Sequence, residues 1–516
     1  MKWGSASTLI EDYTSFFKLE RKYSKAFCWL IVFSFLYIFP ILIANFYYID
    51  DVGRAITGGI SWNRDGRPLL TALIVFLSNG KPIMEISPWM QILAVIVFDY
   101  ASILFARKYV VSASSLQIFF LTAFGFVNWF LLENVSYKYE SLGMLASISI
   151  PLILYALPDK VGGGKKQIVF TLFSVMASLS LYQVSIGAYL SLIIIEMLYL
   201  LYQKTAWKQV FKWSIMRMIA IAAGSILYKL TIAKHFVPQV GYSADHGHLV
   251  GLTAQGLTEV YHHFLTFGLM WKDYFLTLRY AGDDMYCCRN NSLGNYDLEI
   301  RERERCTTDR DNSFFLSSPI LLALSSVIAL LVLQYPIYAP RVMLSFTIFT
   351  LYAGLMVYHL SKLYKGVLVA AGIVLVLTLS FSSVYENLLT RQDHINALVA
   401  TRLANDLDNT EMESGQKIKF VSFIRHSPKC KELLLYEKKS PLLSRLVPIY
   451  MNNNWFWGYQ YLSHFRMGSV QGLPDKNLNK KEDLSYIKGK KPVRHNEFYE
   501  LYLQENRAIV LFPESL

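Results

Sequence analysis

Two neighbouring carboxylates, Asp50 and Asp51, follow the first long apolar segment of the chain, within the run YYIDDVGR. Their mutual repulsion can raise the pKa of one of them into the range of a general base, whereas Arg54 or Arg67 would lower it. A solvated helix start, with an aspartate as N-cap and the arginines on lipid headgroups, explains the same residues about as well. The cluster is a candidate for acid–base chemistry.

More polar residues stand where other apolar segments end. Residues 133–144 contain Glu133 and Glu140, which flank Tyr137 and Lys138. Carboxylates are costly beside hydrocarbon, so these two either line a cavity shared with the first loop or are solvated in a turn, the simpler reading for Glu133 in particular. Further on, Gln183 offers hydrogen-bonding groups suited to sugar hydroxyls, although a tight helix turn would need the same type of side chain.

Arg341 follows Tyr-Ala-Pro near the start of a later apolar segment. Its planar guanidinium group can bind a phosphate through two parallel hydrogen bonds, and snorkelling to the membrane surface is the plain alternative. Near the C-terminus, Trp455 and Trp457 could stack on sugar rings, but a buried core or a surface resting on the bilayer explains them equally well. No zinc-type histidine spacing, Walker loop or dinucleotide fingerprint occurs.

Long apolar segments must position these residues. Of the 516 residues, 53% are hydrophobic and 17% are charged, which excludes an ordinary soluble enzyme and a disordered chain. The net charge of +12 is assigned to membrane orientation rather than to nucleic-acid binding. Runs long enough to cross a ~30 Å hydrocarbon core are predicted near residues 26–46, 88–106, 114–132, 142–158, 167–182, 185–202, 214–234, 314–334, 342–360 and 366–386.

Basic residues alternate between the two sides of these segments, as the positive-inside rule requires. They place an amphipathic segment, residues 1–25, in the cytoplasm, and loops 47–86 and 236–312 outside. Ten spans, an even number, would return the C-terminus to the cytoplasm. The lysines of turn 361–366, however, favour a cytoplasmic position for that turn, which places the C-terminal residues after the last span outside. We therefore expect nine or ten spans, with residues 314–334 re-entrant at Pro319.

The last 130 residues are less apolar and more charged than the rest. We expect residues 26–386 to form the membrane domain and residues 387–516 a small soluble α/β domain, with strands near 417–424 and 508–512. In the loop 236–312, Cys306 could form a disulfide with Cys287 or Cys288 in an oxidising compartment.

The order of these motifs resembles one enzyme family. A first span, the YIDDVGR loop with Trp62 and Gly66-Arg67-Pro68 behind it, the turn at 136–144, Tyr182-Gln183 and Pro340-Arg341 are similar to those of the serotype-converting O-antigen glucosyltransferases of Gram-negative bacteria, the Gtr family. The likeness covers most of residues 26–386 and is strongest at 47–68. Glu140 departs from it, because the family more often has an aspartate there.

The resemblance implies a GT-C type membrane glycosyltransferase of the bacterial inner membrane, which transfers glucose from undecaprenyl-phosphate glucose to O-antigen on the periplasmic face with inversion. An acidic residue of the first exported loop would then be the base, Asp51 before Asp50. No cofactor is implied with certainty, and a divalent cation could bridge Asp50 and the phosphate. A flippase of lipid-linked sugars and an O-antigen polymerase are the alternatives. The expected phosphate-binding residues are Arg341, Arg67 and Arg54, and the expected sugar- or acceptor-binding residues are Glu140, Tyr137, Lys138, Gln183, Asp65, Trp455 and Trp457.

Overall fold

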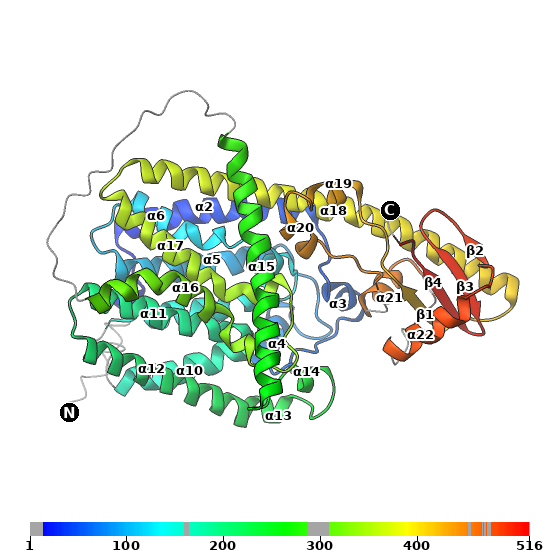
Figure 1. Cartoon of the computed structure of the whole chain (residues 1–516), viewed down its shortest axis with the longest axis horizontal. Helices are drawn as coiled ribbons and strands as arrows, with labels where there is room; N and C mark the ends of the chain where they lie inside the picture. The colour runs from blue at the N-terminus through cyan, green and yellow to red at the C-terminus, as the bar shows by residue number, and fades with distance from the viewer. Residues whose placement is uncertain are drawn as a thin grey trace.

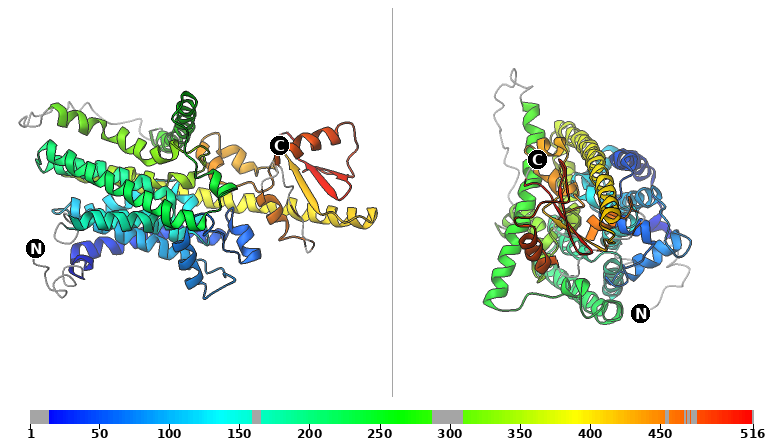
Figure 2. Two further views of the ribbon diagram at one scale, coloured as in Figure 1. Left: turned by 90° about the horizontal axis from the view of Figure 1, so that it is seen from below. Right: turned by 90° about the vertical axis from the view of Figure 1, so that its right-hand side faces the viewer.

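The computed structural model describes residues 14–158, 165–286, 309–452, 456–466, 468, 471 and 476–514. Two bodies are visible: a bundle of long helices and a small domain at one of its ends that carries a sheet (Figure 1). Helix α2 starts at the end of the bundle opposite to the sheet (Figure 2). The predicted arrangement of a helical membrane domain with a C-terminal α/β domain is confirmed.

Apolar helices make up the bundle. Six stretches of the described chain are long and apolar enough to cross a membrane, and five apolar helices are shorter. The six are α2 (Arg21–Ala44), α5 (Trp89–Tyr109), η2 with α11 (Gln183–Ser185 and Ile186–Tyr202), α12 with η3 and α13 (Trp207–Tyr228, Lys229–Ala233 and Lys234–Phe236), η4 with α17 (Pro340–Ser345 and Phe346–Ser361) and α18 (Gly366–Ser414). The shorter helices are α4 (Pro68–Leu77), α6 with η1 (Ser115–Ala123 and Phe124–Val127), α8 (Ser141–Ala156), α10 (Lys165–Leu181) and α16 (Asp309–Leu331).

All ten predicted spans coincide with helices, but residues 314–334 do not have the expected re-entrant form. Helix α16 is continuous through Pro319 and runs along the bundle beside α11, from the end where α2 starts toward the sheet (Figure 2). It is not re-entrant. The chain therefore changes ends between α12 and α16 rather than inside α16.

The region predicted as a polar loop, residues 236–312, contains two helices, α14 (Tyr242–Asp245) and the 33-residue α15 (Ala254–Tyr286). Helix α15 lies across the side of the bundle rather than along it (Figures 1 and 2). Its buried face includes Phe267, Met270 and Tyr274, and the Tyr274 hydroxyl donates to the Val127 carbonyl at 2.8 Å. Polar residues interrupt its sequence, because it does not have to cross the hydrocarbon core.

Helix α18 joins the two bodies. With 49 residues it is about 74 Å long, more than twice the ~30 Å hydrocarbon core, so its second half projects into the C-terminal domain. The predicted domain boundary near residue 387 thus falls inside one continuous helix. The small domain is completed by β1 (Phe420–Ile424), α19 (Lys431–Tyr436), α20 (Pro441–Leu446), α21 (Phe456–Leu462), α22 (Lys476–Ile487), β2 (Arg494–His495), β3 (Glu500–Gln504) and β4 (Arg507–Leu511).

The strands form one mixed sheet in the order β1-β4-β3-β2, with β1 parallel to β4 and the other pairs antiparallel. Val510 pairs with Phe423 on one side and with Leu501 on the other, and all three side chains are buried. The central strand β4 is the predicted apolar run near the end of the chain. Its burial on both sides of the ladder anchors the C-terminus of the domain.

Candidate active site

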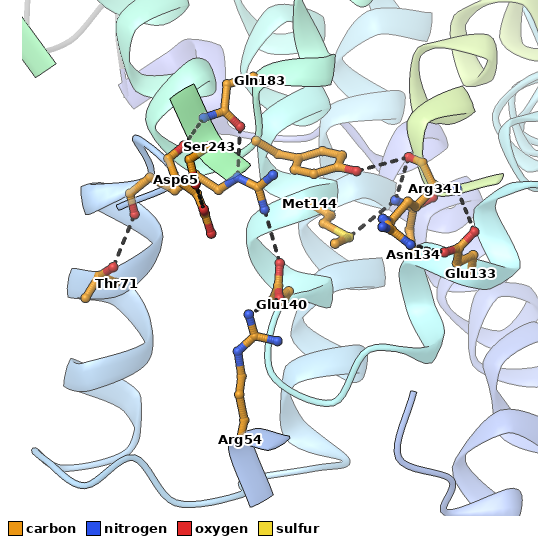
Figure 3. A network of polar contacts seen from close by, with 12 residues as sticks. Arg54, Asp65, Thr71, Glu133, Asn134, Glu140, Met144, Gln183, Ser243 and Arg341 are labelled. Carbon is orange, nitrogen blue, oxygen red and sulfur yellow. Dashed lines mark hydrogen bonds and ion pairs between the residues drawn. The ribbon is translucent and has the colours of Figure 1, made fainter. Parts of the chain in front are cut away.

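The predicted site residues gather at the end of the bundle that faces the small domain. Five short elements supply most of them: α3 (Asp51–Thr57), α7 (Leu131–Ser136), the turn 137–140, η2 and η4. Figure 3 shows the polar network that they form. Because these elements lie at the same end of the bundle, residues far apart in the sequence come together there.

Glu140 stands at the centre of one half of this network. Its carboxylate accepts from Arg54 Nη2 at 2.9 Å and from Arg67 Nη1 at 3.3 Å, and it is 2% exposed (Figure 3). Arg67 Nε also donates to Gln183 Oε1 at 2.8 Å, and its guanidinium group lies 4.7 Å from the centre of the Tyr182 ring. Glu140 is therefore no solvated loop residue. One carboxylate here balances two arginines.

Arg54 is buried, but part of its guanidinium group has no hydrogen-bond partner among the described residues. Its guanidinium group lies 4.4 Å from the centre of the Trp62 ring, and within the described chain its Nε and Nη1 atoms are buried without a hydrogen-bond partner. Buried N–H groups without an acceptor are unfavourable. An anion beside Arg54 would satisfy them.

Arg341 and Glu133 form the other half. Arg341 donates to the Glu133 carboxylate from Nη1 and from its backbone N–H, both at 2.8 Å. The Arg341 carbonyl accepts from Asn134 Nδ2 at 3.1 Å, and the same amide group contacts Met144 Sδ at 3.3 Å (Figure 3). Burial raises the pKa of Glu133, which Arg341 partly offsets. The solvated-turn reading of Glu133, which is 1% exposed, is thus wrong, and Arg341 is an internal arginine rather than one extended to the membrane surface.

Asp51 is completely buried and faces the turn that contains Lys138. Its Oδ2 accepts from the Lys138 backbone N–H at 2.7 Å, and its Oδ1 is buried without a partner among the described residues. Burial raises the pKa of Asp51 to about 8, against the opposing effects of Arg54 and the Lys138 N–H. The Lys138 ammonium group binds Asn45 Oδ1 at 2.6 Å and Glu85 Oε1 at 2.8 Å. Asp51 and Lys138 therefore organise this turn.

Asp50 differs from Asp51 in its exposure and in its hydrogen-bond partner. It is half-buried, and its Oδ1 accepts from the indole N–H of Trp457 on α21 at 2.8 Å. It lies close enough to Arg54, Glu133, Tyr137 and Arg341 for its charge to act on all four. Asp50 thus lies near both halves of the polar network.

The remaining predicted residues lie beside the polar network, at its edge, or outside the described residues. Tyr137 is buried beside the network, and within the described chain its hydroxyl has no partner. Asp65 lies at its edge, where its carbonyl accepts from Gln183 and its carboxylate from Ser243 at 2.6 Å. Trp455 and the cysteines 287, 288 and 306 lie outside the described residues. In the part of the chain that is described, no three His, Cys, Asp or Glu side chains are grouped as metal ligands.

Several members of the site were not predicted from the sequence. They are neutral or distant partners of the predicted charges: Asn45, Glu85, Asn134 and Tyr228. Tyr228 donates to the Gly66 carbonyl at 2.7 Å and thereby holds the loop in front of Arg67. Only Glu85 had a usable signal, a carboxylate inside the first exported loop.

Comparison with known proteins identifies this arrangement. The family Glucosyl transferase GtrII matches residues 39–270, which include both aspartates, Arg54, Arg67, Glu140 and Gln183. This part of the chain, less than half of its length, is thus similar to the GtrII glucosyl transferases. The expected resemblance to the Gtr glucosyltransferases is confirmed by this match, and the apolar helices indicate a multi-pass membrane protein.

One curated relative adds to this match. The "Uncharacterized 55.3 kDa protein in gtrB 5'region" of Salmonella phage P22 is 25% identical over 449 residues, which cover 82% of this chain and 86% of the relative. No solved structure matches the chain. Arg341 and Trp457 lie beyond the GtrII match, so the structure rather than the match brings them to the GtrII residues.

Proposed function

We propose that this GtrII protein is an inverting glucosyltransferase that moves glucose from a polyprenyl-phosphate donor, undecaprenyl-phosphate glucose, to O-antigen at the periplasmic face of the inner membrane. The observation that supports this proposal best is the position of Asp50, which is half-buried at one end of the helical bundle and whose charge acts on Arg54 and Arg341. A lipid-linked sugar phosphate presents its anionic group at that depth.

Basic residues support the periplasmic placement of the site. Arg107 and Lys108 end α5 at the end of the bundle away from the site, and Lys362 and Lys365 lie between α17 and α18 at that same end. The positive-inside rule assigns such an end to the cytoplasm. The site and the C-terminal domain then lie in the periplasm.

Asp50 is the better candidate for the base, which reverses the order expected from the sequence. A base must reach the hydroxyl proton of the acceptor. The Asp51 side chain is fully buried and one of its oxygens accepts from the Lys138 N–H, whereas Asp50 is half-buried and lies close enough to Arg54 and Arg341 for its charge to act on both. We assign proton abstraction to Asp50 and support of the 137–140 turn to Asp51.

The arginines suit a phosphate with a single negative charge. Glu133 pairs with Arg341, but Glu140 alone pairs with both Arg54 and Arg67, so these two arginines share one carboxylate in their direct ion pairs. A sugar linked to a polyprenyl chain through a phosphodiester carries one negative charge. In Arg341, moreover, Nη1 donates to Glu133, and a guanidinium group has further N–H groups with which to bind a phosphate.

The chemistry then follows as a single displacement. Asp50 accepts the proton of the acceptor hydroxyl, the hydroxyl oxygen attacks the anomeric carbon, and the bond from that carbon to the phosphate oxygen breaks. The departing phosphate takes the electron pair of the broken bond, and the arginines stabilise its growing charge. Because attack occurs from the face opposite to the phosphate, the configuration at the anomeric carbon inverts. Gln183 and Tyr137 lie beside the arginines, where they can bind sugar hydroxyls.

Asp50→Asn tests this proposal against the matched variant Asp51→Asn, which makes the same change one residue away. We expect Asp50→Asn to lower the transfer rate about 10²- to 10⁴-fold and Asp51→Asn to lower it less than about tenfold. Transfer is measured with purified protein, undecaprenyl-phosphate glucose and O-antigen, and in cells by chemical analysis of the polysaccharide. Full activity of Asp50→Asn would refute the mechanism, and donor translocation without glucose transfer would indicate a flippase.

A further inference from the structure

The C-terminal domain reaches the candidate base through α21 and the turn behind it. The His464 ring hydrogen-bonds through Nε2 to the Val52 carbonyl at 3.0 Å, and it stacks on Tyr47 with ring centres 5.9 Å apart. Gln460 lies directly on Gly53, where a Cβ atom would come within 2.7 Å of its carboxamide group. The absence of a side chain at Gly53 thus lets α21 approach the helix that follows Asp50.

Trp457 makes the contact nearest to the proposed chemistry. Its indole Nε1 donates to Asp50 Oδ1 at 2.8 Å. An indole N–H can only donate, so it always presents a hydrogen to the carboxylate and never competes with it for a proton. The contact fixes one carboxylate oxygen and leaves Oδ2 to accept a proton from elsewhere.

We propose that Trp457 is a positioning residue for Asp50, so that the C-terminal domain completes the active site of the GtrII domain. The inference rests on the proposed role of Asp50 as the base. It assigns a function to a segment outside the GtrII match and replaces sugar stacking as the expected role of Trp457.

The hydrogen bond acts on both geometry and charge. A donor to a carboxylate favours its ionised form, which is the form a base needs. The other charged or titratable groups that face Asp50 are Asp51 and Arg54 on α3, Glu133 on α7, Tyr137, and Arg341 on η4. Their charges remain when Trp457 is replaced, so a change in pH dependence reports on the lost indole N–H.

Trp457→Phe removes the N–H and keeps an aromatic ring. We expect kcat to fall about 10- to 100-fold, the size of one hydrogen bond to a charged group, with KM for donor and acceptor within about twofold. The acid limb of the pH–rate profile should move to higher pH. Tyr459→Phe, an aromatic change on the same helix that also removes one polar atom, is the control and should leave both kcat and the profile unchanged.

Other outcomes separate the possible failures. A raised acceptor KM with an unchanged acid limb in Trp457→Phe would overturn positioning in favour of substrate contact, and unchanged kinetics would overturn any role. Thermal unfolding of each purified variant shows whether the domain interface persists, and Trp457→His, which restores a ring N–H, should recover part of kcat if the fold is intact. If Asp50→Asn is inactive but Trp457→Phe is normal, only this inference fails; if Asp50→Asn is active, the assignment of the base fails first.

Discussion

Asp51→Asn should change how stability depends on pH. Burial raises the pKa of Asp51 from 3.8 to about 8, so the folded protein keeps its proton in a pH range where the unfolded chain has lost it. Folding therefore weakens as pH rises from about 4 to about 8. About four pKa units at 1.36 kcal/mol each set a ceiling of about 6 kcal/mol on this loss. Asparagine has no titratable proton in this range, so the stability of Asp51→Asn lacks this dependence on pH.

The assay is thermal unfolding of the purified protein in detergent at pH 5, 6, 7 and 8. At pH 5 Asp51 is protonated in the native fold, so both folded proteins have a neutral side chain at this buried position. Their difference in stability at pH 5 is the reference for the higher pH values. The stability of Asp51→Asn relative to the native protein should then increase steadily toward pH 8. Asp245→Asn, a change at an exposed aspartate, corrects for the general effect of pH. Parallel curves for Asp51→Asn and the native protein would refute the argument from burial.

Two further substitutions test the arginine contacts. Glu140→Gln leaves Arg54 and Arg67 without their shared carboxylate, so we expect a loss of about 3–5 kcal/mol in stability, measured by thermal unfolding; an unchanged melting temperature would contradict a buried ion pair. Arg341→Lys cannot hold Glu133 and a phosphate through one planar fork, so donor KM should rise about 10- to 100-fold in steady-state kinetics, and an unchanged KM would limit Arg341 to its pairing with Glu133.

The membrane helices could be predicted from the sequence because a bilayer imposes one strong rule. A segment that crosses it must be apolar for most of its length and must satisfy its backbone internally. Each predicted span is a helix for this reason. Helix α15 was not predicted because it lies across the bundle, and because Lys272 and Asp273 interrupt its apolar residues.

The site was predictable as a set of residues but not as a set of contacts. Polar residues at span ends indicated where chemistry could occur, and Glu140 and Arg341 do lie in one network, with Asp50 close enough for its charge to act on Arg341. Which arginine meets which carboxylate depends on pairings across about 70 to more than 200 residues, such as Arg341 with Glu133, and no local pattern encodes them.

The order of Asp50 and Asp51 shows where the limit lies. Both residues have the same side chain and are adjacent in the sequence, yet one has no exposed surface and the other is half-buried. Helix α3 starts at Asp51, and the 100° turn per residue directs the two carboxylates to different partners: the Lys138 N–H for Asp51 and the Trp457 indole for Asp50. The second partner comes from a domain 400 residues away in the sequence, so no pattern near the two aspartates could show that Asp50 is the one that this domain contacts.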